Sequence, residues 1–456
     1  MRLSQSTLAS LSPQVSRPGY DRDEQAAGIV HFGIGAFHRA HQAWYTDRAM
    51  EGGDRDWGVL GVSLRSSSVA DQLNPQDGLY TVTEKAADGD ATRLIGAVKR
   101  VLVASQQGEA VVEALSAPAT RIVSFTVTEK GYCRGAYGSR DPDLAGPSSF
   151  YAYLSAALRR RKDAGLPGLT LLSCDNLADN GRQLEGLMAA YLDRHDPALR
   201  SWFDAECACP STMVDRIVPA TTQTDLDNLA ARIGVDDSGA VMTEPFTQWV
   251  IEDRFAGERP RWDAVGAQLV ANVASYETAK LRMLNGAHSM LAYCGLRRGY
   301  QYVHEAVGDP DLRRMAHSLM LNEAAPTIAA GPDQDLTRYA DELIARFANP
   351  ALNHRLIQIA MDGSQKIPQR WLETLAANQG MGRACPAILG AVACWIEHLR
   401  GANGPVDDPR AEELRVALDG SSDPVRALFA QGGKLASEWH PGETDRSAIL
   451  GALADA

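Results

Sequence analysis

The first half of the chain alternates short apolar runs with longer amphipathic stretches. Runs typical of buried strands occupy residues 28–32, 57–64, 121–127 and 169–173. Segments with helical periodicity, such as residues 151–165, lie between them. Because strands that alternate with helices form βαβ units, this pattern predicts an α/β fold with a largely parallel, doubly wound sheet.

The second half has a different pattern. From about residue 271 onward, apolar residues recur at spacings of three and four, and runs of β-branched residues are few. We therefore expect an α/β domain over residues 1–270 and a mainly helical domain over residues 271–456. Residues 243–255 and 268–273 could be strands or connecting segments of either domain.

Composition and charge narrow the class of protein. The 456 residues are 45% hydrophobic and 22% charged, as in folded globular enzymes, and the length allows two or three domains. The net charge of -12 opposes binding to nucleic-acid phosphates or anionic membranes, so neither partner is expected. The beginning of the chain lacks the apolar core of a signal peptide, and no later stretch approaches a membrane span. A cytoplasmic protein is expected.

The seven cysteines are scattered, odd in number and lack paired CxxC spacing. Cys207 and Cys209 are the one close pair, but no nearby His could complete a metal site. The sequence thus predicts free thiols in a reducing compartment and no bound metal.

A glycine turn follows the first predicted strand. Gly33 permits a tight turn, and Gly35 allows backbone amides to approach a pyrophosphate at the start of the next helix. His38 takes the place of the third glycine of G-x-G-x-x-G, so an ordinary turn is also compatible with this motif. The residues predicted to line a dinucleotide cofactor here are Gly33, Ile34, Gly35, Ala36 and Phe37.

The end of the second predicted strand bears on the choice of cofactor. A carboxylate there would bind the adenosine ribose and favour NAD, but the chain has Arg65 followed by serines 66–68. Arg65 and the serines could receive the 2'-phosphate of NADP. An ordinary surface loop explains them equally well.

Residues 276–295 carry unusual polar residues within an apolar helical pattern. Measured about the axis of an α-helix with Lys280 at 0°, Glu277 would lie at about 60°, His288 at about 80° and Asn285 at about 140°. These four residues would share one face. The pattern allows a functional cluster, or polar groups that are solvated or satisfied elsewhere.

This chain resembles the polyol-specific long-chain dehydrogenases, a family that includes mannitol 2-dehydrogenases and fructuronate reductases (D-mannonate oxidoreductases). The sequence Lys280-x4-Asn285-x2-His288 is similar to the catalytic signature of the family. Family-like segments, in order over roughly residues 28–400, are HFGIGAFHRAHQA, SFTVTEKGYC, LLSCDNLADNG, TMVDRIVPA, EPFTQWVIEDRF, KLRMLNGAHS and MDGSQKIPQR. The resemblance implies a Rossmann-type N-terminal domain, a largely helical C-terminal domain, a cleft between them, and metal-free chemistry with NAD(P).

The resemblance also implies residue roles in carbonyl reduction, where the developing oxyanion needs a proton donor and hydrogen-bond donors. Lys280 matches the general acid and base of the family, and Asn176 and Asn285 match its oxyanion-stabilising amides. His288 matches the histidine that orients the substrate. Glu277 matches a carboxylate that assists proton exchange, although it would also suit an ordinary helix surface.

Further matched positions concern the substrate. Val214 and Asp215 match residues beside the nicotinamide and substrate pocket, and Lys366 matches a substrate-contacting lysine. Polyol enzymes of the family carry glycine at the position of Lys130 and arginine at that of Gln358. These two departures, together with the segments GAFHRAHQA, TEKGYC, RMLNGAHS and MDGSQKIPQR, make the chain more similar to fructuronate reductases than to mannitol dehydrogenases.

The expected reaction is therefore the reversible reduction of D-fructuronate to D-mannonate. Burying a uronate carboxylate requires cations or several hydrogen-bond donors, and Lys130, Lys366 and Arg370 are the candidates. The lack of arginine at Gln358 weakens that argument. A mannitol 2-dehydrogenase or a related polyol dehydrogenase remains an alternative, and a non-catalytic dinucleotide-binding protein is a more remote one. The resemblance favours NAD as the cofactor, without excluding NADP. It also favours a monomer or a weak dimer.

Overall fold

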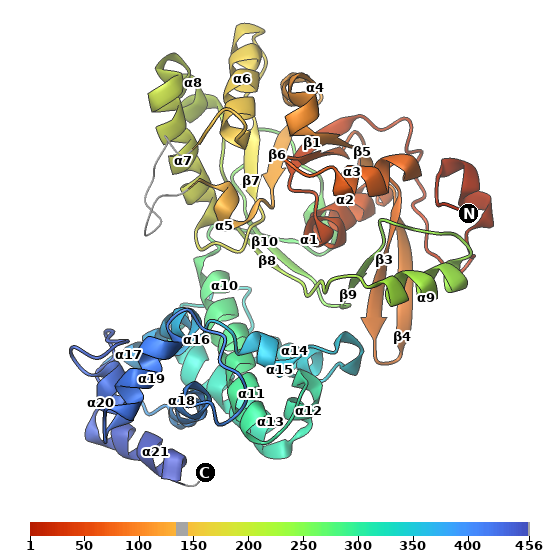
Figure 1. Cartoon of the computed structure of the whole chain (residues 1–456). Helices are drawn as coiled ribbons and strands as arrows, with labels where there is room; N and C mark the ends of the chain where they lie inside the picture. Colours follow the sequence, from red (N-terminus) through yellow and green to blue (C-terminus); the bar gives the residue numbers. More distant parts are fainter. Residues whose placement is uncertain (134–144, 455–456) are drawn as a thin grey trace. The chain divides into compact units, whose positions relative to one another are not determined.

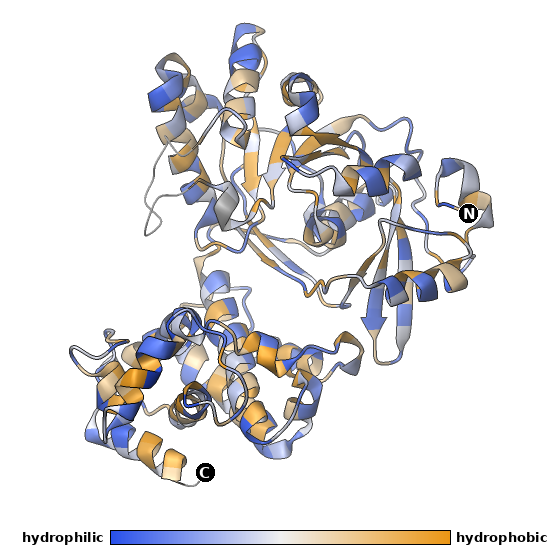
Figure 2. Cartoon of the chain, viewed as in Figure 1, coloured by the Kyte–Doolittle hydropathy of each residue, from blue (hydrophilic) through white to orange (hydrophobic). Residues whose placement is uncertain are grey.

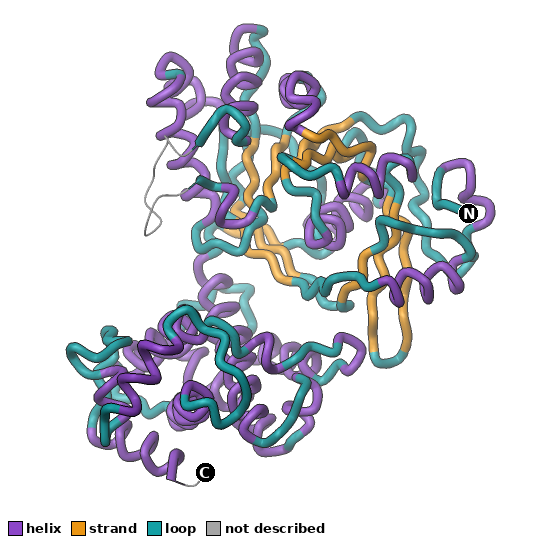
Figure 3. The backbone as a smooth tube through the Cα atoms, viewed as in Figure 1, coloured by secondary structure: helices purple, strands orange, loops and turns teal. Residues whose placement is uncertain are grey.

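The structure, a computed structural model, describes residues 1–133 and 145–454, without the side chains of residues 129 and 130. The chain divides into two compact units, Met1–Val273 and Ala274–Ala456. Figure 3 shows all of the described strands in the first unit, whereas the described part of the second unit consists of helices and loops. This arrangement confirms the predicted fold class.

A parallel five-stranded sheet forms the centre of the first unit (Figure 1). Its strands, in spatial order, are β5 (Val98–Val103), β2 (Gly58–Ser63), β1 (Ala27–Phe32), β6 (Ile122–Phe125) and β7 (Thr170–Ser173). The order reverses direction at β1, as in a doubly wound dinucleotide-binding sheet.

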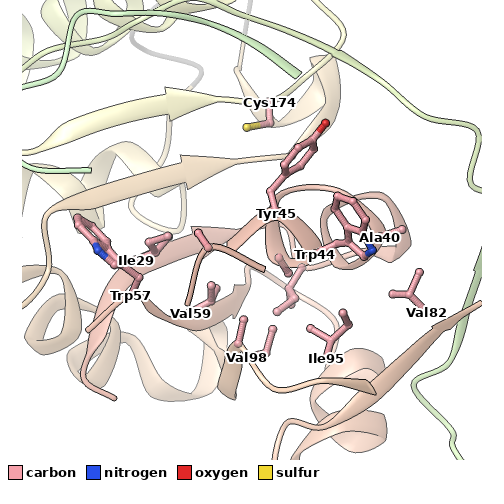
Figure 4. Packing of buried hydrophobic residues seen from close by; sticks show 14 of the residues in the cluster. Ile29, Ala40, Trp44, Tyr45, Trp57, Val59, Val82, Ile95, Val98 and Cys174 are labelled. Carbon is pink, nitrogen blue, oxygen red and sulfur yellow. The ribbon is translucent and has the colours of Figure 1, made fainter. Parts of the chain in front are cut away.

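Both faces of this sheet are covered by helices. Alternate residues of each strand point to opposite faces, so Ile29 packs in one apolar cluster and its neighbour Val30 in another. Figure 4 shows the first cluster, where Trp44 and Tyr45 lie with strand residues such as Ile29. Burial on both faces explains why the strands are continuous apolar runs in the sequence and in Figure 2.

The helices of the two faces are distributed along the chain. The first face is covered by α1 (Ala36–Ala40), α2 (Gln42–Glu51) and α3 (Ser68–Leu73). The second is covered by α4 (Ala104–Ser116), α6 (Phe150–Asp163), α7 (Asn180–His195) and α8 (Pro197–Glu206). The other helices of this unit are η1 (Gln5–Ser10), η2 (Asn74–Gln76), α5 (Thr128–Gly131), α9 (Gln223–Ile233) and η5 (Trp262–Val265).

Two smaller sheets complete the first unit. One has the order β4 (Gly89–Ile95), β3 (Tyr80–Ala86), β9 (Val241–Thr243). The other has the order β11 (Gln268–Val270), β10 (Gln248–Glu252), β8 (Thr212–Asp215). Residues 243–255 and 268–273, which the sequence left open, thus contribute strands to this unit.

The second unit is helical, as expected, but three of its turns are π-helical. These turns are η6 (Lys280–Asn285), η7 (Leu319–Ala324) and η10 (Pro368–Leu372), and η6 packs against both others. The other elements are α10 (Ala274–Ala279), α11 (Gly286–Arg297), α12 (Val303–Gly308), α13 (Pro310–Ser318), η8 (Ala325–Thr327), α14 (Leu336–Phe347), η9 (Pro350–Leu352), α15 (Leu356–Ile359), α16 (Gly363–Ile367), α17 (Glu373–Gly380), α18 (Pro386–Leu399), α19 (Ala411–Asp419), α20 (Pro424–Phe429) and α21 (Glu443–Ala454). Across the described residues, no helix combines the length and the apolar character that crossing a membrane requires.

Candidate active site

The glycine turn follows β1 directly and has a conformation that only glycine adopts easily. Gly33 has φ of +93°, and a Cβ atom there would lie 2.2 Å from the carbonyl oxygen of Thr126. Gly35 precedes the first residue of α1, and a Cβ atom at Gly35 would meet nothing closer than 3.8 Å. The turn is therefore tight at Gly33 and open at Gly35, which fits the approach of a pyrophosphate to the backbone.

The other residues of the turn secure it to the sheet. Gly61 of β2 leaves room for the buried side chain of Ile34, because a Cβ atom at Gly61 would lie 2.3 Å from Ile34 Cδ1. Ala36 and Phe37 pack against the apolar cluster of the first face. The structure thus brings these predicted cofactor-binding residues together at the carboxyl end of β1.

His38, at the place of the third glycine, is buried and stacks on His31 of β1. The two ring centroids are 3.4 Å apart and the planes differ by 17°. The nitrogens of His31 lie 2.8 Å from Ser124 Oγ and 2.9 Å from Thr126 Oγ1. Burial lowers the pKa of His31 to about 3 and that of His38 well below its ordinary value, so both rings are neutral. Ring stacking, which was not predicted from the sequence, replaces the close glycine contact between helix and strand.

Arg65 lies exposed beyond the end of β2. It forms no ion pair with any carboxylate in the described part of the chain, and Ser105 Oγ donates a 3.4 Å hydrogen bond to its carbonyl oxygen. The hydroxyl of Ser66 bonds to that of Ser68, and Ser67 donates to Asp71 in α3. The loop therefore offers a cation and hydroxyls to a ribose or to its phosphate.

Asn176 is exposed and follows β7, the strand beside β6. The preceding residue, Asp175, accepts hydrogen bonds from the backbone N–H of Val127 at 3.0 Å and of Thr128 at 2.9 Å. The hydroxyl of Tyr132 donates to the same carboxylate at 2.9 Å. These bonds hold Asn176 at the edge of the sheet formed by the carboxyl ends of the strands, where α/β folds bind ligands.

Val214 and Asp215 are buried at the end of β8, outside the five-stranded sheet. The start of β8 is attached to the end of β7, because Thr212 Oγ1 donates a 2.6 Å hydrogen bond to the carbonyl of Ser173. Asn180 also bonds to both backbone groups of Thr212. This network joins β8 to the segment that carries Asn176.

The expectation of one continuous α-helix around Lys280 is wrong. The segment is α-helical in α10, π-helical from Lys280 to Asn285 and α-helical again in α11. Hydrogen bonds in a π-helix join residues five positions apart. The side chains of Lys280 and Asn285 are therefore separated by a smaller angle about the helix axis than the angle of about 140° that an α-helix would give. Glu277, in α10, and Lys280 are both half-buried. Single π-turns in α-helices frequently occur at functional sites.

His288, on the first turn of α11, has a ring enclosed by aromatic neighbours. It stacks on Phe347 at 5.2 Å and meets His354 edge-on at 4.9 Å. The buried Nε2 atom has no hydrogen-bond partner in the part of the protein that the structure describes. Burial of the ring is the main cause that lowers the pKa of His288 well below its ordinary value. Electrostatic interactions lower this pKa further, and they come from His354, Arg370, Arg346 and Lys366. The ring is therefore neutral and can exchange a hydrogen bond with a ligand hydroxyl.

Lys366 and Arg370 share this environment. Arg370 Nη1 donates to Ser289 Oγ at 2.6 Å and lies 3.4 Å from the carbonyl oxygen of Asn285. Burial lowers the pKa of Arg370 to about 10, and no carboxylate of the described chain forms an ion pair with it. Lys366 donates to the carbonyl of Met361, and burial followed by repulsion from Arg370 lowers its pKa.

The second unit thus groups His288, Asn285, Lys366 and Arg370. Arg346 and Ser289 belong to the same group, although neither was predicted from the sequence. Ser289 lies in the family-like segment KLRMLNGAHS, where its position beside His288 was an available signal. The side chain of Lys130 lies outside the described residues. The described residues include no group of three or more His, Cys, Asp or Glu side chains that could hold a metal ion.

Comparisons with known proteins agree with these observations. Residues 27–264 match the mannitol dehydrogenase Rossmann domain, and residues 272–438 match the mannitol dehydrogenase C-terminal domain. The chain is 41% identical over 455 residues to D-mannonate oxidoreductase of Escherichia coli (strain K12), covering 95% of this chain and 93% of the relative. It is 39% identical over 415 residues to polyol:NADP oxidoreductase of Gluconobacter oxydans (strain 621H), and this match covers 88% of this chain and 85% of the relative.

A solved structure shows the same similarity. It is the ternary complex of Pseudomonas fluorescens mannitol 2-dehydrogenase with NAD and D-mannitol, at a TM-score of 0.81 and 36% identity. The match covers 100% of this chain and 96% of that chain. These matches confirm the family resemblance and the two-domain fold class inferred from the sequence.

Proposed function

Because this chain belongs to the mannitol dehydrogenase family of oxidoreductases, we propose that it reversibly reduces D-fructuronate to D-mannonate with NADH. The observation that carries the choice of a sugar acid is the guanidinium of Arg370. It is half-buried beside Asn285 and Ser289, and no described carboxylate pairs with it.

A substrate carboxylate suits this environment. Desolvation disfavours the charged form of Arg370 and of Lys366. Repulsion from Arg370 lowers the pKa of Lys366 further, against the opposing charges of Asp362 and Asp408. A uronate would supply the negative charge and receive charge-assisted hydrogen bonds from the guanidinium. Fructose and mannitol have no charge to contribute, so they would leave this cost in place.

The bound nicotinamide would supply or accept the hydride. In reduction, Lys280 donates a proton to the carbonyl oxygen of the substrate, and in oxidation it takes the proton from the hydroxyl. By resemblance to the family, Asn176 and Asn285 are the amides that donate hydrogen bonds where negative charge develops. The neutral ring of His288 orients the substrate through a hydroxyl, and Glu277 exchanges the proton of Lys280 with solvent. The proposal requires no metal.

The residues of the first unit that would hold the dinucleotide are those of the glycine turn, with Arg65 near the adenosine ribose and with Val214 and Asp215 near the nicotinamide. NAD is preferred because the solved mannitol 2-dehydrogenase complex contains NAD. NADP is the second candidate, supported by the exposed guanidinium of Arg65 and by the polyol:NADP oxidoreductase relative.

Steady-state kinetics test the proposal. We expect kcat/KM for D-fructuronate to exceed that for D-fructose, and NADH to be used in preference to NADPH. A preference for fructose of at least about a hundredfold, equivalent to about 2.7 kcal/mol in transition-state binding, would instead assign a mannitol 2-dehydrogenase. Lack of activity with any ketose or uronate would support the non-catalytic alternative.

A further inference from the structure

Two buried cysteine side chains of the second unit touch each other across a helix contact. Cys294 lies on α11 and Cys394 on α18, and their Sγ atoms are 2.8 Å apart. Both thiols are free, and the exposed fraction is only 3% for Cys294 and 5% for Cys394. The two helices pack against one another, so their packing holds the sulfur atoms together.

The cysteine pair lines a cavity of about 660 Å³. Its wall combines charged and polar side chains, among them Arg297 and Glu397, with apolar ones such as Leu312. Such a volume admits water and small polar solutes, since one liquid water occupies about 30 Å³. A small oxidant can therefore reach two thiols that are almost completely shielded from bulk solvent.

Arg297 makes the two thiols chemically unequal. Its Nη1 atom lies 3.9 Å from the sulfur of Cys394, while Nε forms an ion pair with Glu397 at 3.1 Å and Nη2 donates to the carbonyl of Ala452. The hydrogen bond from Cys294 and then the guanidinium lower the pKa of Cys394, against the opposing effects of burial and of Glu397. The pKa of Cys294 is raised, chiefly by the same hydrogen bond and by burial. Cys394 is consequently the more acidic thiol of the pair and the one that more readily supplies a nucleophilic thiolate.

We propose that Cys294 and Cys394 are a peroxide-sensitive pair that forms a reversible disulfide. The thiolate of Cys394 attacks one oxygen of hydrogen peroxide, the O–O bond breaks, and hydroxide leaves and is protonated to water. Cys294 then attacks the sulfenic sulfur of Cys394, the S–O bond breaks, and a second water is released. Two thiols are oxidised, and one peroxide is reduced to two waters. A dithiol reductant reverses the change by thiol–disulfide exchange.

The disulfide would stabilise the second unit without displacing the proposed active-site residue His288. It would join α11 to α18 across a sequence separation of 100 residues, which restricts the unfolded chain. Because the sulfur atoms already touch, neither helix has to move far. His288 lies six residues before Cys294, about 9 Å along the helix axis, so its position should be retained. The proposal is independent of which substrate the enzyme uses.

Peptide mapping of the full-length protein tests the proposal. The protein is treated with hydrogen peroxide, alkylated with iodoacetamide and digested without reductant. We expect a cross-linked peptide joining Cys294 to Cys394, lighter by about 2 Da than the two free peptides together and lost after dithiothreitol treatment. The oxidised protein should melt on the order of 5 °C higher. Two fully alkylated thiols, sulfinic acids without the cross-link, or a disulfide to another cysteine would each overturn it.

Variants separate the pair from the other cysteines. Cys294→Ser and Cys394→Ser should each abolish the cross-link and the rise in melting temperature. Cys385→Ser is the matched control, because Cys385 is also buried and immediately precedes α18, and it should preserve both effects. Arg297→Gln should slow the oxidation several-fold, and an unchanged rate would contradict the assignment of Cys394 as the attacking thiolate. If a serine variant does not fold, the peptide map of the unaltered protein still decides.

Discussion

The guanidinium of Arg370 donates a 2.6 Å hydrogen bond to the hydroxyl of Ser289, the residue that follows His288. This bond joins η10 to the first turn of α11, although the two residues are 81 positions apart. It places the positive charge of Arg370, which pairs with no carboxylate in the described part of the chain, beside the histidine proposed to orient the substrate.

Replacing Arg370 should therefore affect sugar acids more than neutral sugars. Arg370→Gln should lower kcat/KM for D-fructuronate by about 30-fold or more, corresponding to about 2 kcal/mol for a lost buried charge pair. The value for D-fructose should fall much less. Steady-state assays with both substrates measure the difference, and Arg400→Gln, at an exposed arginine of the same unit, is the control. Equal losses for both substrates would show that Arg370 does not bind the carboxylate.

Lys280 carries the proposed proton transfer. Lys280→Ala should lower kcat by about 10²–10⁴-fold, the usual contribution of a general acid or base. The pH dependence of kcat in the oxidation direction should also change, because the group that accepts the proton is gone. Arg282→Ala, two residues later on the same π-turn, is the control for structural disturbance. A loss of only a few-fold in Lys280→Ala would contradict the role.

The two glycines of the turn should respond differently to the same substitution. Gly33→Ala should destabilise the protein by about 2 kcal/mol or more, because φ is +93° and the methyl group would meet Thr126. Gly35→Ala should fold normally, because nothing lies within 3.8 Å of its Cβ position, but it should weaken NADH binding about tenfold. Urea unfolding and NADH fluorescence titration measure the two effects. Unchanged NADH affinity in Gly35→Ala would argue against a pyrophosphate at this turn.

Arg65 should distinguish the two cofactors. Arg65→Ala should leave kcat/KM for NADH within about twofold and lower that for NADPH about tenfold, because a phosphate contact of about 1.4 kcal/mol is lost. Parallel assays with both cofactors measure the ratio. A similar fall with NADH would place the guanidinium at another part of the dinucleotide.

Glu323 should make the stability of the protein depend on pH. Its carboxylate accepts the backbone N–H groups of Ala387 at 2.7 Å and Ile388 at 2.8 Å, at the start of α18. Burial nevertheless raises its pKa from 4.5 to about 7. As the pH rises, Glu323 therefore ionises in the unfolded chain before it ionises in the folded protein. Its contribution to the free energy of unfolding is complete below pH 4.5 and is lost between about pH 4.5 and 7. At about 1.4 kcal/mol per pH unit, the loss amounts to about 3 kcal/mol.

Urea unfolding at pH 5 and pH 8 measures this effect. Glu323→Gln should remove most of the difference between the two pH values, whereas Glu373→Gln, at an exposed residue of the same unit, should preserve it. If Glu323→Gln and the unaltered protein show the same dependence on pH, another group is responsible.

The amino-acid sequence was sufficient to predict features that depend on neighbouring residues. Continuous apolar runs predicted strands buried on both faces, and Gly33 and Gly35 predicted a turn after the first of them. The sequence could not predict the π-turn from Lys280 to Asn285. This turn has no distinctive local composition, and η6 packs against η7 and η10, which come from other parts of the chain.

What the sequence by itself determined is the order of strands and helices, the glycine turn and the residues of the family signature. The tertiary structure alone decided that Arg370 reaches Ser289, that Glu323 meets the start of α18 and that Cys294 touches Cys394. These contacts join residues 64 to 100 positions apart. Their distances depend on how the helices pack, and local sequence preferences carry no information about that packing.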